Sequence, residues 1–259
     1  MEHIELGWDE FWAEIFRVKH RNSIQGIEKY DEMLAEFCIE VMDLQEGNRV
    51  LDIACGAGNH AIKFAKRNLE VSAFDLSETL ISVAEESAKQ QAVKVDFHVG
   101  DMREMEFEDE FDAAVLLSHS FGFFDHGENK RVLQGSFDGL VEDGHLLLDL
   151  LNPYNLPDFQ QTWTELDGGY LLSRPHTLDA ASSVLRGKPA TFIDIEGNRL
   201  ISMNQDALAN NNVRIYSALE IKTMLEDIGF KKTELYGSNK MPKMPYSASS
   251  ERIVVVASK

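Results

Sequence analysis

Residues 50–61, with the sequence VLDIACGAGNHA, constrain the fold of this chain more than any other stretch. They begin with a short apolar run, which is typical of a parallel strand buried on both faces of a sheet. Gly56 and Gly58 follow, and glycines permit a tight turn that brings the backbone close to a ligand. From His60 onward apolar residues recur at helical spacing. The turn is therefore expected to end at a helix N-terminus, where free N–H groups and the helix dipole favour an anionic group.

Two classes of ligand fit this turn, and Asp52 distinguishes them. The spacing of Gly56, Gly58 and Ala61 matches the dinucleotide pattern G-x-G-x-x-G/A, so the glycines alone leave an NAD(P)-dependent oxidoreductase open. Asp52 lies near the C-terminal end of the expected strand, close to where the pyrophosphate of a dinucleotide would lie. A carboxylate repels that charge, whereas it is favourable beside a sulfonium or ammonium group.

Acidic residues also end the next two expected strands. Asp75 closes the strand at 69–75, where a carboxylate can accept hydrogen bonds from two hydroxyls of one ribose. Its place before Ser77 also fits an acid at a helix N-terminus, and both roles can hold together. Asp101 follows a third strand and can accept from an exocyclic amine, and Met102 can pack against an adenine face.

The rest of the chain alternates between strands and helices, except in two appendages. Aromatic and aliphatic residues repeat at helical spacing in residues 8–46, which therefore look helical. Residues 159–212 break the alternation with short strands and a turn at Glu196-Gly197-Asn198, which is typical of an antiparallel insertion. We expect strands there at 170–173, 191–195 and 199–203. The predicted division is an N-terminal helical cap at 1–46, a core at 47–158 and 213–259, and an antiparallel β insertion at 159–212.

The amino-acid composition limits the classes of molecule that the protein can bind. The net charge of the 259-residue chain is −19, which disfavours nucleic acids and anionic membranes as partners. There is no apolar run of about 18 residues to span a membrane. The two cysteines form no C-x-x-C pair and the histidines show no zinc spacing, so we expect a reducing, cytoplasmic compartment and no metal. A homodimer stays open.

The string DIACGAG at residues 52–58 resembles the first motif of class I S-adenosylmethionine-dependent methyltransferases. The resemblance runs from about Val50 to the C-terminus. The segment SFGFF at 120–124, the β insertion and RIYS at 214–217 are similar to small-molecule methyltransferases of mostly unassigned substrate. The fold implied is α/β: a doubly wound, seven-stranded, Rossmann-like sheet with N-terminal helices and an antiparallel β insertion.

The resemblance implies S-adenosyl-L-methionine as cofactor and S-adenosyl-L-homocysteine as product. The residues implied near the methionine part are Asp52, Gly56, Ala57, Gly58 and Ser118. The residues implied at the ribose and adenine are Asp75, Leu76, Asp101 and Met102.

The implied activity is methyl transfer to a small-molecule acceptor by in-line displacement, with the O, N, C or S acceptor atom left open. His119 follows the fourth strand on the ligand side and is a candidate general base for a hydroxyl acceptor, or a loop histidine bonded to backbone. Trp12, Phe121 and Tyr216 are candidate walls of the acceptor site. A non-catalytic module that binds S-adenosylmethionine is a further alternative.

Overall fold

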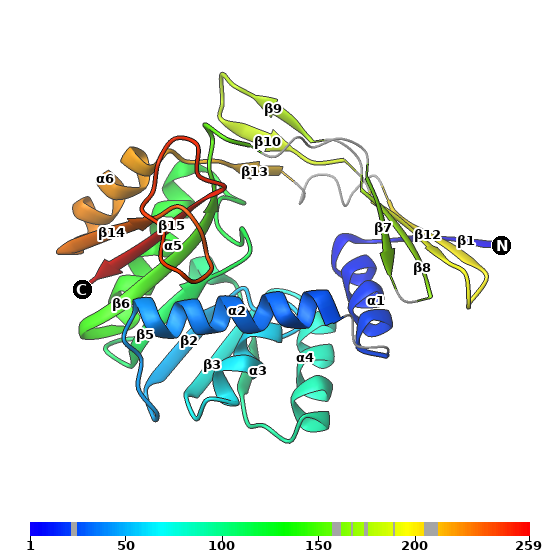
Figure 1. Cartoon of the computed structure of the whole chain (residues 1–259), viewed down its shortest axis with the longest axis horizontal. Helices are drawn as coiled ribbons and strands as arrows, with labels where there is room; N and C mark the ends of the chain where they lie inside the picture. Colours follow the sequence, from blue (N-terminus) through cyan, green and yellow to red (C-terminus); the bar gives the residue numbers. More distant parts are fainter. Residues whose placement is uncertain (22–24, 157–161, 167, 174–175, 189, 205–211) are drawn as a thin grey trace.

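The computed structural model describes the whole chain except residues 22–24, 157–161, 167, 174–175, 189 and 205–211. The predicted boundary at 158–159 lies outside the described residues. At the centre is a seven-stranded sheet with the order β14-β15-β6-β5-β2-β3-β4 (Figure 1). Its strands are β2 (Arg49–Ile53), β3 (Glu70–Asp75), β4 (Asp96–Val99), β5 (Phe111–Leu116), β6 (Leu140–Leu151), β14 (Lys232–Tyr236) and β15 (Arg252–Ser258).

Only β15 runs against its neighbours in this sheet. It pairs antiparallel with both β14 and β6, while the pairs from β6 through to β4 are parallel. The strand order reverses after β4, because β5 is added in parallel on the opposite side of β2 from β3. The C-terminal ends of β2 and β5 therefore adjoin at the sheet edge where ligands of open α/β sheets bind. The predicted seven-stranded α/β fold is confirmed.

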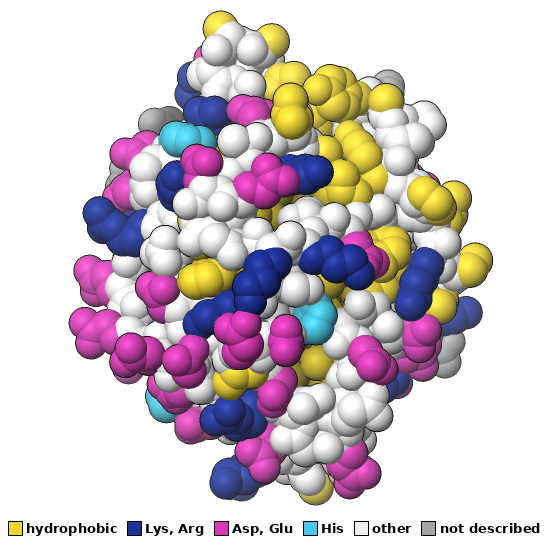
Figure 2. All heavy atoms as spheres, turned by 90° about the vertical axis from the view of Figure 1, so that its left-hand side faces the viewer, with side chains coloured by type: hydrophobic (Ala, Val, Ile, Leu, Met, Phe, Trp, Pro, Cys, Tyr) yellow, Lys and Arg dark blue, Asp and Glu magenta, His cyan; other side chains and the backbone are white. Residues whose placement is uncertain are grey.

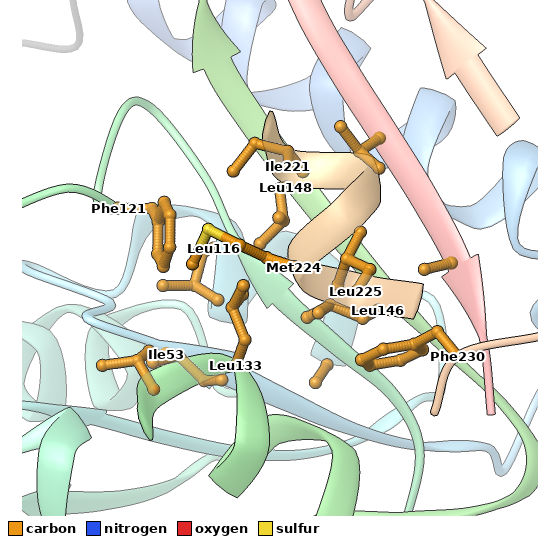
Figure 3. Packing of buried hydrophobic residues seen from close by; sticks show 14 of the residues in the cluster. Ile53, Leu116, Phe121, Leu133, Leu146, Leu148, Ile221, Met224, Leu225 and Phe230 are labelled. Atoms are coloured by element: carbon orange, nitrogen blue, oxygen red, sulfur yellow. The ribbon is translucent and has the colours of Figure 1, made fainter. Parts of the chain in front are cut away.

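Helices cover both faces of the sheet, because neighbouring strand residues point to opposite sides. Val50 packs on the side of α2 and α3, whereas Leu51 packs on the side of α5 and α6. Figure 3 shows the second side, where Ile53 and Leu148 of the strands meet side chains of the two helices. The helices around the sheet are α2 (Gln25–Val41), α3 (Asn59–Ala65), α4 (Glu78–Gln90), α5 (His126–Gly139) and α6 (Ala218–Ile228), with a 3-10 turn η1 (Met102–Glu104).

The insertion forms two further sheets. The three predicted strands are confirmed. They are β8 (Gly169–Ser173), β11 (Thr191–Asp194) and β12 (Arg199–Met203). They belong to a five-stranded sheet with the order β1-β12-β11-β8-β7. A three-stranded sheet has the order β13-β10-β9. The strands not predicted are β1 (Glu2–Leu6), β7 (Thr162–Leu166), β9 (Thr177–Asp179), β10 (Val184–Arg186) and β13 (Asn212–Arg214).

Helix α1 (Trp8–Arg21) lies between the five-stranded sheet and the core (Figure 1). Phe11 and Ile15 pack with side chains of the insertion, including Phe192. Ala13, from the same helix, packs with Ala57 of the glycine turn and with α4. Strand β1 pairs in parallel with β12, so the segment leading into α1 is fixed to the insertion. Within the described ranges, no helix has both the length and the apolar character that crossing a bilayer requires.

Candidate active site

The glycine turn between β2 and α3 contains two left-handed glycines with different surroundings. Gly58 is the N-cap of α3 with a φ of 74°, and a Cβ there would lie 2.8 Å from both Ala84 Cβ and the Phe97 ring. Only glycine therefore fits at this position without displacement of its neighbours. Gly56 also has a positive φ, 55°, but a Cβ there would meet nothing within 4 Å. The space in front of Gly56 lets a ligand approach the backbone closely.

The carboxylate of Asp75 joins this turn to the next helix. Asp75 is the last residue of β3, and its Oδ2 accepts a hydrogen bond from the Gly56 N–H at 2.9 Å. Its Oδ1 accepts one from the Ser77 N–H at 3.0 Å. Burial raises the pKa of Asp75 even though these N–H groups lower it, and nearby Asp9 raises it further. Each oxygen retains a lone pair, so two sugar hydroxyls can still donate to it.

A cavity of about 400 Å³ lies at the ends of β3 and β4. It brings together four predicted residues, Asp75, Leu76, Asp101 and Met102. Seven further lining residues were not predicted as site residues: Trp8, Ala54, Phe74, Gly100, Arg103, Phe123 and Phe124. Asp52, Gly56, Ala57, Gly58 and Ser118 are not part of its lining. The aromatic runs that contain Trp8 and Phe123 were visible in the sequence, but helical spacing does not show which ring faces a cavity.

Asp52 in β2 and His60 in α3 are titratable residues on either side of the glycine turn. Burial raises the pKa of Asp52 to about 6, against the opposing effect of His60. Burial lowers the pKa of His60, but Asp31, 3.5 Å away, and Asp52 together raise it on balance. Asp52 Oδ2 is buried and has no hydrogen-bond partner in the described part of the chain. A buried acceptor without a partner is costly, so a donor or cation beside it is favourable.

Ser118 and His119 follow β5 in a strained backbone conformation. Both have a positive φ, 52° and 68°, which costs a non-glycine residue about 1–2 kcal/mol. Asp149 holds them: its Oδ2 accepts from the Ser118 N–H at 3.2 Å, and its backbone oxygen accepts from the His119 N–H at 3.2 Å. Asp149 is fully buried, and Asn239 also donates to its Oδ2. The loop that reaches the predicted methionine end is therefore fixed by a residue of β6.

Arg252 makes His119 a poor proton acceptor. Its Nη1 lies 2.6 Å from Nε2 and 3.0 Å from Nδ1 of His119, and Nη2 donates to the Tyr30 hydroxyl at 3.1 Å. Burial and then the Arg252 charge lower the pKa of His119 to about 3. The imidazole is therefore neutral at neutral pH and accepts from Arg252. Its role as a general base stays a prediction.

We expect His119 to make the protein sensitive to acid. The unfolded chain binds a proton at His119 below about pH 6.5, while the folded chain does not until about pH 3, so the free energy of unfolding falls as the pH drops through this window. His119→Gln removes this pH-dependent contribution to the free energy of unfolding. Between pH 7 and pH 5 wild type should lose about 2 kcal/mol more than the variant, measured by urea unfolding. A wild-type-to-variant difference that is constant with pH would contradict the buried, neutral imidazole.

Of the three predicted acceptor residues, Phe121 and Tyr216 pack together in the core, and Trp12 belongs to α1. Phe121 and Tyr216 are each 2% exposed and lie in the core, with ring centroids 5.5 Å apart. The Tyr216 hydroxyl accepts a hydrogen bond from buried Asn129 at 3.0 Å. Trp12 of α1 is half-buried and contacts the Phe11 ring edge to face at 5.4 Å. None of the three lines the cavity, and their contact with an acceptor stays a prediction.

Among the described residues, no three histidine, cysteine or acidic side chains gather in a way that could hold a metal ion. The groups that are present suit a nucleoside with a cationic side chain. Two carboxylates, Asp75 and Asp101, face one cavity whose walls are largely apolar or aromatic. Beyond the open backbone of Gly56, Asp52 offers an unpartnered buried oxygen. The residues present therefore fit S-adenosylmethionine.

Comparisons with known proteins agree with this fit. A family model described as a methyltransferase domain matches residues 50–144. One relative is a protein of Geobacillus sp. (strain WCH70) that is named as a methyltransferase. It is 30% identical over 145 residues, which are 52% of this chain and 59% of that protein. The chain thus spans little more than half the length of that relative. A glycine/sarcosine N-methyltransferase of Aphanothece halophytica is 25% identical over 240 residues, 91% of this chain and 82% of that enzyme.

A solved structure shows the same fold. An S-adenosylmethionine-dependent methyltransferase from Clostridium acetobutylicum matches with a TM-score of 0.73 at 18% identity, covering 95% of this chain and 97% of that chain. The motif at residues 52–58, the matched domain and the shared sheet all agree. Residues 50–144 therefore match a methyltransferase domain, within the fold of the class I S-adenosylmethionine-dependent methyltransferases, and the residues present support S-adenosylmethionine as the cofactor.

Proposed function

We propose that this chain transfers the methyl group of S-adenosylmethionine to a small-molecule acceptor by direct in-line displacement. The observation that carries the proposal is that Asp75 and Asp101 share one cavity beside the open backbone of Gly56. When bound, the cofactor supplies a methyl group that its positive sulfur has already activated. The task of the protein is alignment, which can lower a barrier by about 7–11 kcal/mol.

In this proposal the cofactor residues divide into two groups. Asp75 binds the ribose hydroxyls, and Leu76, Asp101 and Met102 hold the adenine. The methionine part lies against the glycine turn and Ser118, whose position Asp149 fixes. Asp52 lies beneath the turn and favours the cationic end of the cofactor. The residues assigned to the methionine part are Asp52, Gly56, Ala57, Gly58 and Ser118.

A nicotinamide dinucleotide suits the same turn poorly. The Gly56 N–H, which would face a pyrophosphate, already donates to Asp75, so a second negative charge meets a carboxylate there. Thermal unfolding with S-adenosylhomocysteine and with NADH tests this, because a ligand at about 100 times its Kd stabilises a fold by about 2.7 kcal/mol. We expect stabilisation by S-adenosylhomocysteine alone. Stabilisation by NADH alone would favour the oxidoreductase.

We further propose that the acceptor atom is an amine nitrogen. The imidazole beside Ser118 has its pKa lowered to about 3, and so provides little base for a hydroxyl acceptor. A neutral amine brings its own lone pair, and the relative from Aphanothece halophytica is named as an N-methyltransferase of glycine and sarcosine. Formation of S-adenosylhomocysteine should be faster with amines than with matched alcohols, and a non-catalytic module would show no turnover. Preferential turnover of alcohols, slowed about 10²-fold or more in His119→Gln, would contradict this.

A small acceptor also fits the surroundings of the cavity. Trp8 of α1 lines it, and Asp9 Oδ2 accepts from the Ser77 hydroxyl at 3.4 Å, so this helix closes over the cofactor. We propose that segments 1–46 and 159–212 cover the core formed by 47–158 and 213–259. On the face of the molecule that carries α6 and β14, Figure 2 shows Lys and Arg side chains interspersed with Asp and Glu, so this face offers no continuous basic surface for a nucleic acid. The homodimer and the cytoplasmic location stay predictions.

Trp8 should report cofactor binding through its fluorescence. Both Trp8 and Trp12 pack between the insertion and the core, and of the two Trp8 alone lines the cavity. Titration with S-adenosylhomocysteine should change the emission of wild type and of Trp12→Phe, but not of Trp8→Phe. Trp8→Ala should weaken the binding about tenfold, in the range of losses measured for removing an aromatic ring stacked on a base. A full signal in Trp8→Phe would place the cofactor away from α1.

A further inference from the structure

Arg103 holds the Asp101 carboxylate through both of its oxygens. The Arg103 backbone N–H donates to Oδ1 at 2.9 Å, and Nε lies 3.0 Å from Oδ1 and 3.0 Å from Oδ2. Nη2 donates to Oδ2 at 2.6 Å. This is a forked guanidinium–carboxylate contact, which fixes the plane of the carboxylate as well as its charge.

The same guanidinium is held from two other sides. Nη1 donates to Glu128 Oε1 of α5 at 2.9 Å. The central carbon of Arg103 lies 4.4 Å from the centroid of the Phe124 ring, within the range of a cation–π contact. Arg103, Asp101 and Phe124 all line the cavity. Arg103 is thus a fixed part of the wall, although a third of its side chain is exposed.

The hydrogen bonds to Asp101 leave a limited acceptor capacity. An ionised carboxylate offers about four lone-pair sites. The two donors on Oδ1 fill that oxygen, and Nη2 takes one site on Oδ2 while Nε is shared between the oxygens. One site on Oδ2 therefore remains. It accepts from an amino group and repels a carbonyl oxygen.

We propose that Arg103 is a positioning residue that makes the cavity select a 6-amino purine over a 6-oxo purine. It does so by fixing the Asp101 carboxylate, and with Phe124 it closes one wall against the base. The inference rests on the proposed function, because it places the adenine of the cofactor at Asp101. It adds a residue that acts through Asp101 rather than on the reacting atoms.

Calorimetry with two ligands tests this. S-adenosylhomocysteine carries the 6-amino group, and S-inosylhomocysteine carries a carbonyl oxygen in its place. We expect wild type to prefer the adenine ligand by about 10²-fold or more, since a site with a polar partner rejects an analogue that cannot pair with it. Arg103→Gln should reduce that ratio at least tenfold. Arg103→Lys, which keeps the charge but loses the fork, should fall between the two.

The matched control is Arg131→Gln, which removes an exposed positive charge from α5. It should leave both affinities and their ratio unchanged. Melting temperatures of all variants should stay close to wild type, because ion pairs that remain partly exposed, as those of Arg103 do, contribute about 0–1 kcal/mol. An equal loss for both ligands in Arg103→Gln would overturn the inference and reduce Arg103 to a wall residue. So would a ratio that stays the same because neither affinity changes, while failure of wild type to bind S-adenosylhomocysteine would overturn the proposed function itself.

Discussion

Asp75→Ala is expected to weaken binding of S-adenosylhomocysteine by about 10²–10⁴-fold. Two ribose hydroxyls can donate to this carboxylate, and each hydrogen bond to a charged group is worth roughly 1.5–3 kcal/mol, where 1.4 kcal/mol is a factor of ten. The variant also loses the acceptor for the Gly56 N–H, so the glycine turn itself becomes less fixed. Asp75→Asn keeps the shape and one carbonyl oxygen, and it should lie between wild type and Asp75→Ala. Calorimetry measures the dissociation constant of S-adenosylhomocysteine for wild type and for the two variants.

Glu70→Ala is the matched control for this prediction. Glu70 begins the same strand at its opposite end and is exposed, so its removal changes the net charge equally without touching the cavity. Its affinity should equal that of wild type. A melting temperature for each variant separates lost binding from lost folding. If Asp75→Ala folds and binds as tightly as Glu70→Ala, the ribose does not lie at Asp75.

The core sheet could be predicted because its signals are local. Buried strands such as β2 and β15 are apolar runs of a few residues, and α6 carries both a serine N-cap and a stopping glycine. Strand β1 carried no comparable signal. It has only two apolar residues, Ile4 and Leu6, and its partner β12 lies far along the chain. A strand fixed by pairing rather than by its own pattern is invisible to periodicity.

Some residues of the candidate site could be predicted from local sequence signals, and others could not. Asp75 and Asp101 could be predicted because each ends a strand, and the ends of parallel strands meet at one edge. Arg252 could not, because it reaches His119 from the last strand of the sheet. The sequence therefore left His119 open as a candidate base or a loop histidine, without showing the positive charge that lowers its pKa. Residues at the ends of neighbouring parallel strands can be placed together once the fold is predicted. A contact between side chains of distant strands cannot, because it depends on where each side chain lies in the structure.

The two glycines of the turn should separate stability from binding. Gly58→Ala places a Cβ 2.8 Å from Ala84 Cβ and the Phe97 ring, in a left-handed residue. The left-handed conformation costs about 1–2 kcal/mol and overpacking about 1–3 kcal/mol, so the free energy of unfolding should fall by roughly 2–5 kcal/mol. Gly56→Ala carries only the conformational cost, because its Cβ meets no atom of the described residues within 4 Å. Urea unfolding of both variants gives the comparison.

The order of the two variants should reverse for ligand binding. In the binding mode that we propose, the Cβ of Gly56→Ala projects into the space of the methionine part of the cofactor, whereas that of Gly58→Ala faces α4 and β4. Gly56→Ala should therefore stay folded and lose affinity for S-adenosylhomocysteine. The folded molecules of Gly58→Ala should lose less affinity for S-adenosylhomocysteine than Gly56→Ala does. If Gly56→Ala binds as wild type does, the cofactor does not contact this turn, because the only change there is one methyl group in open space.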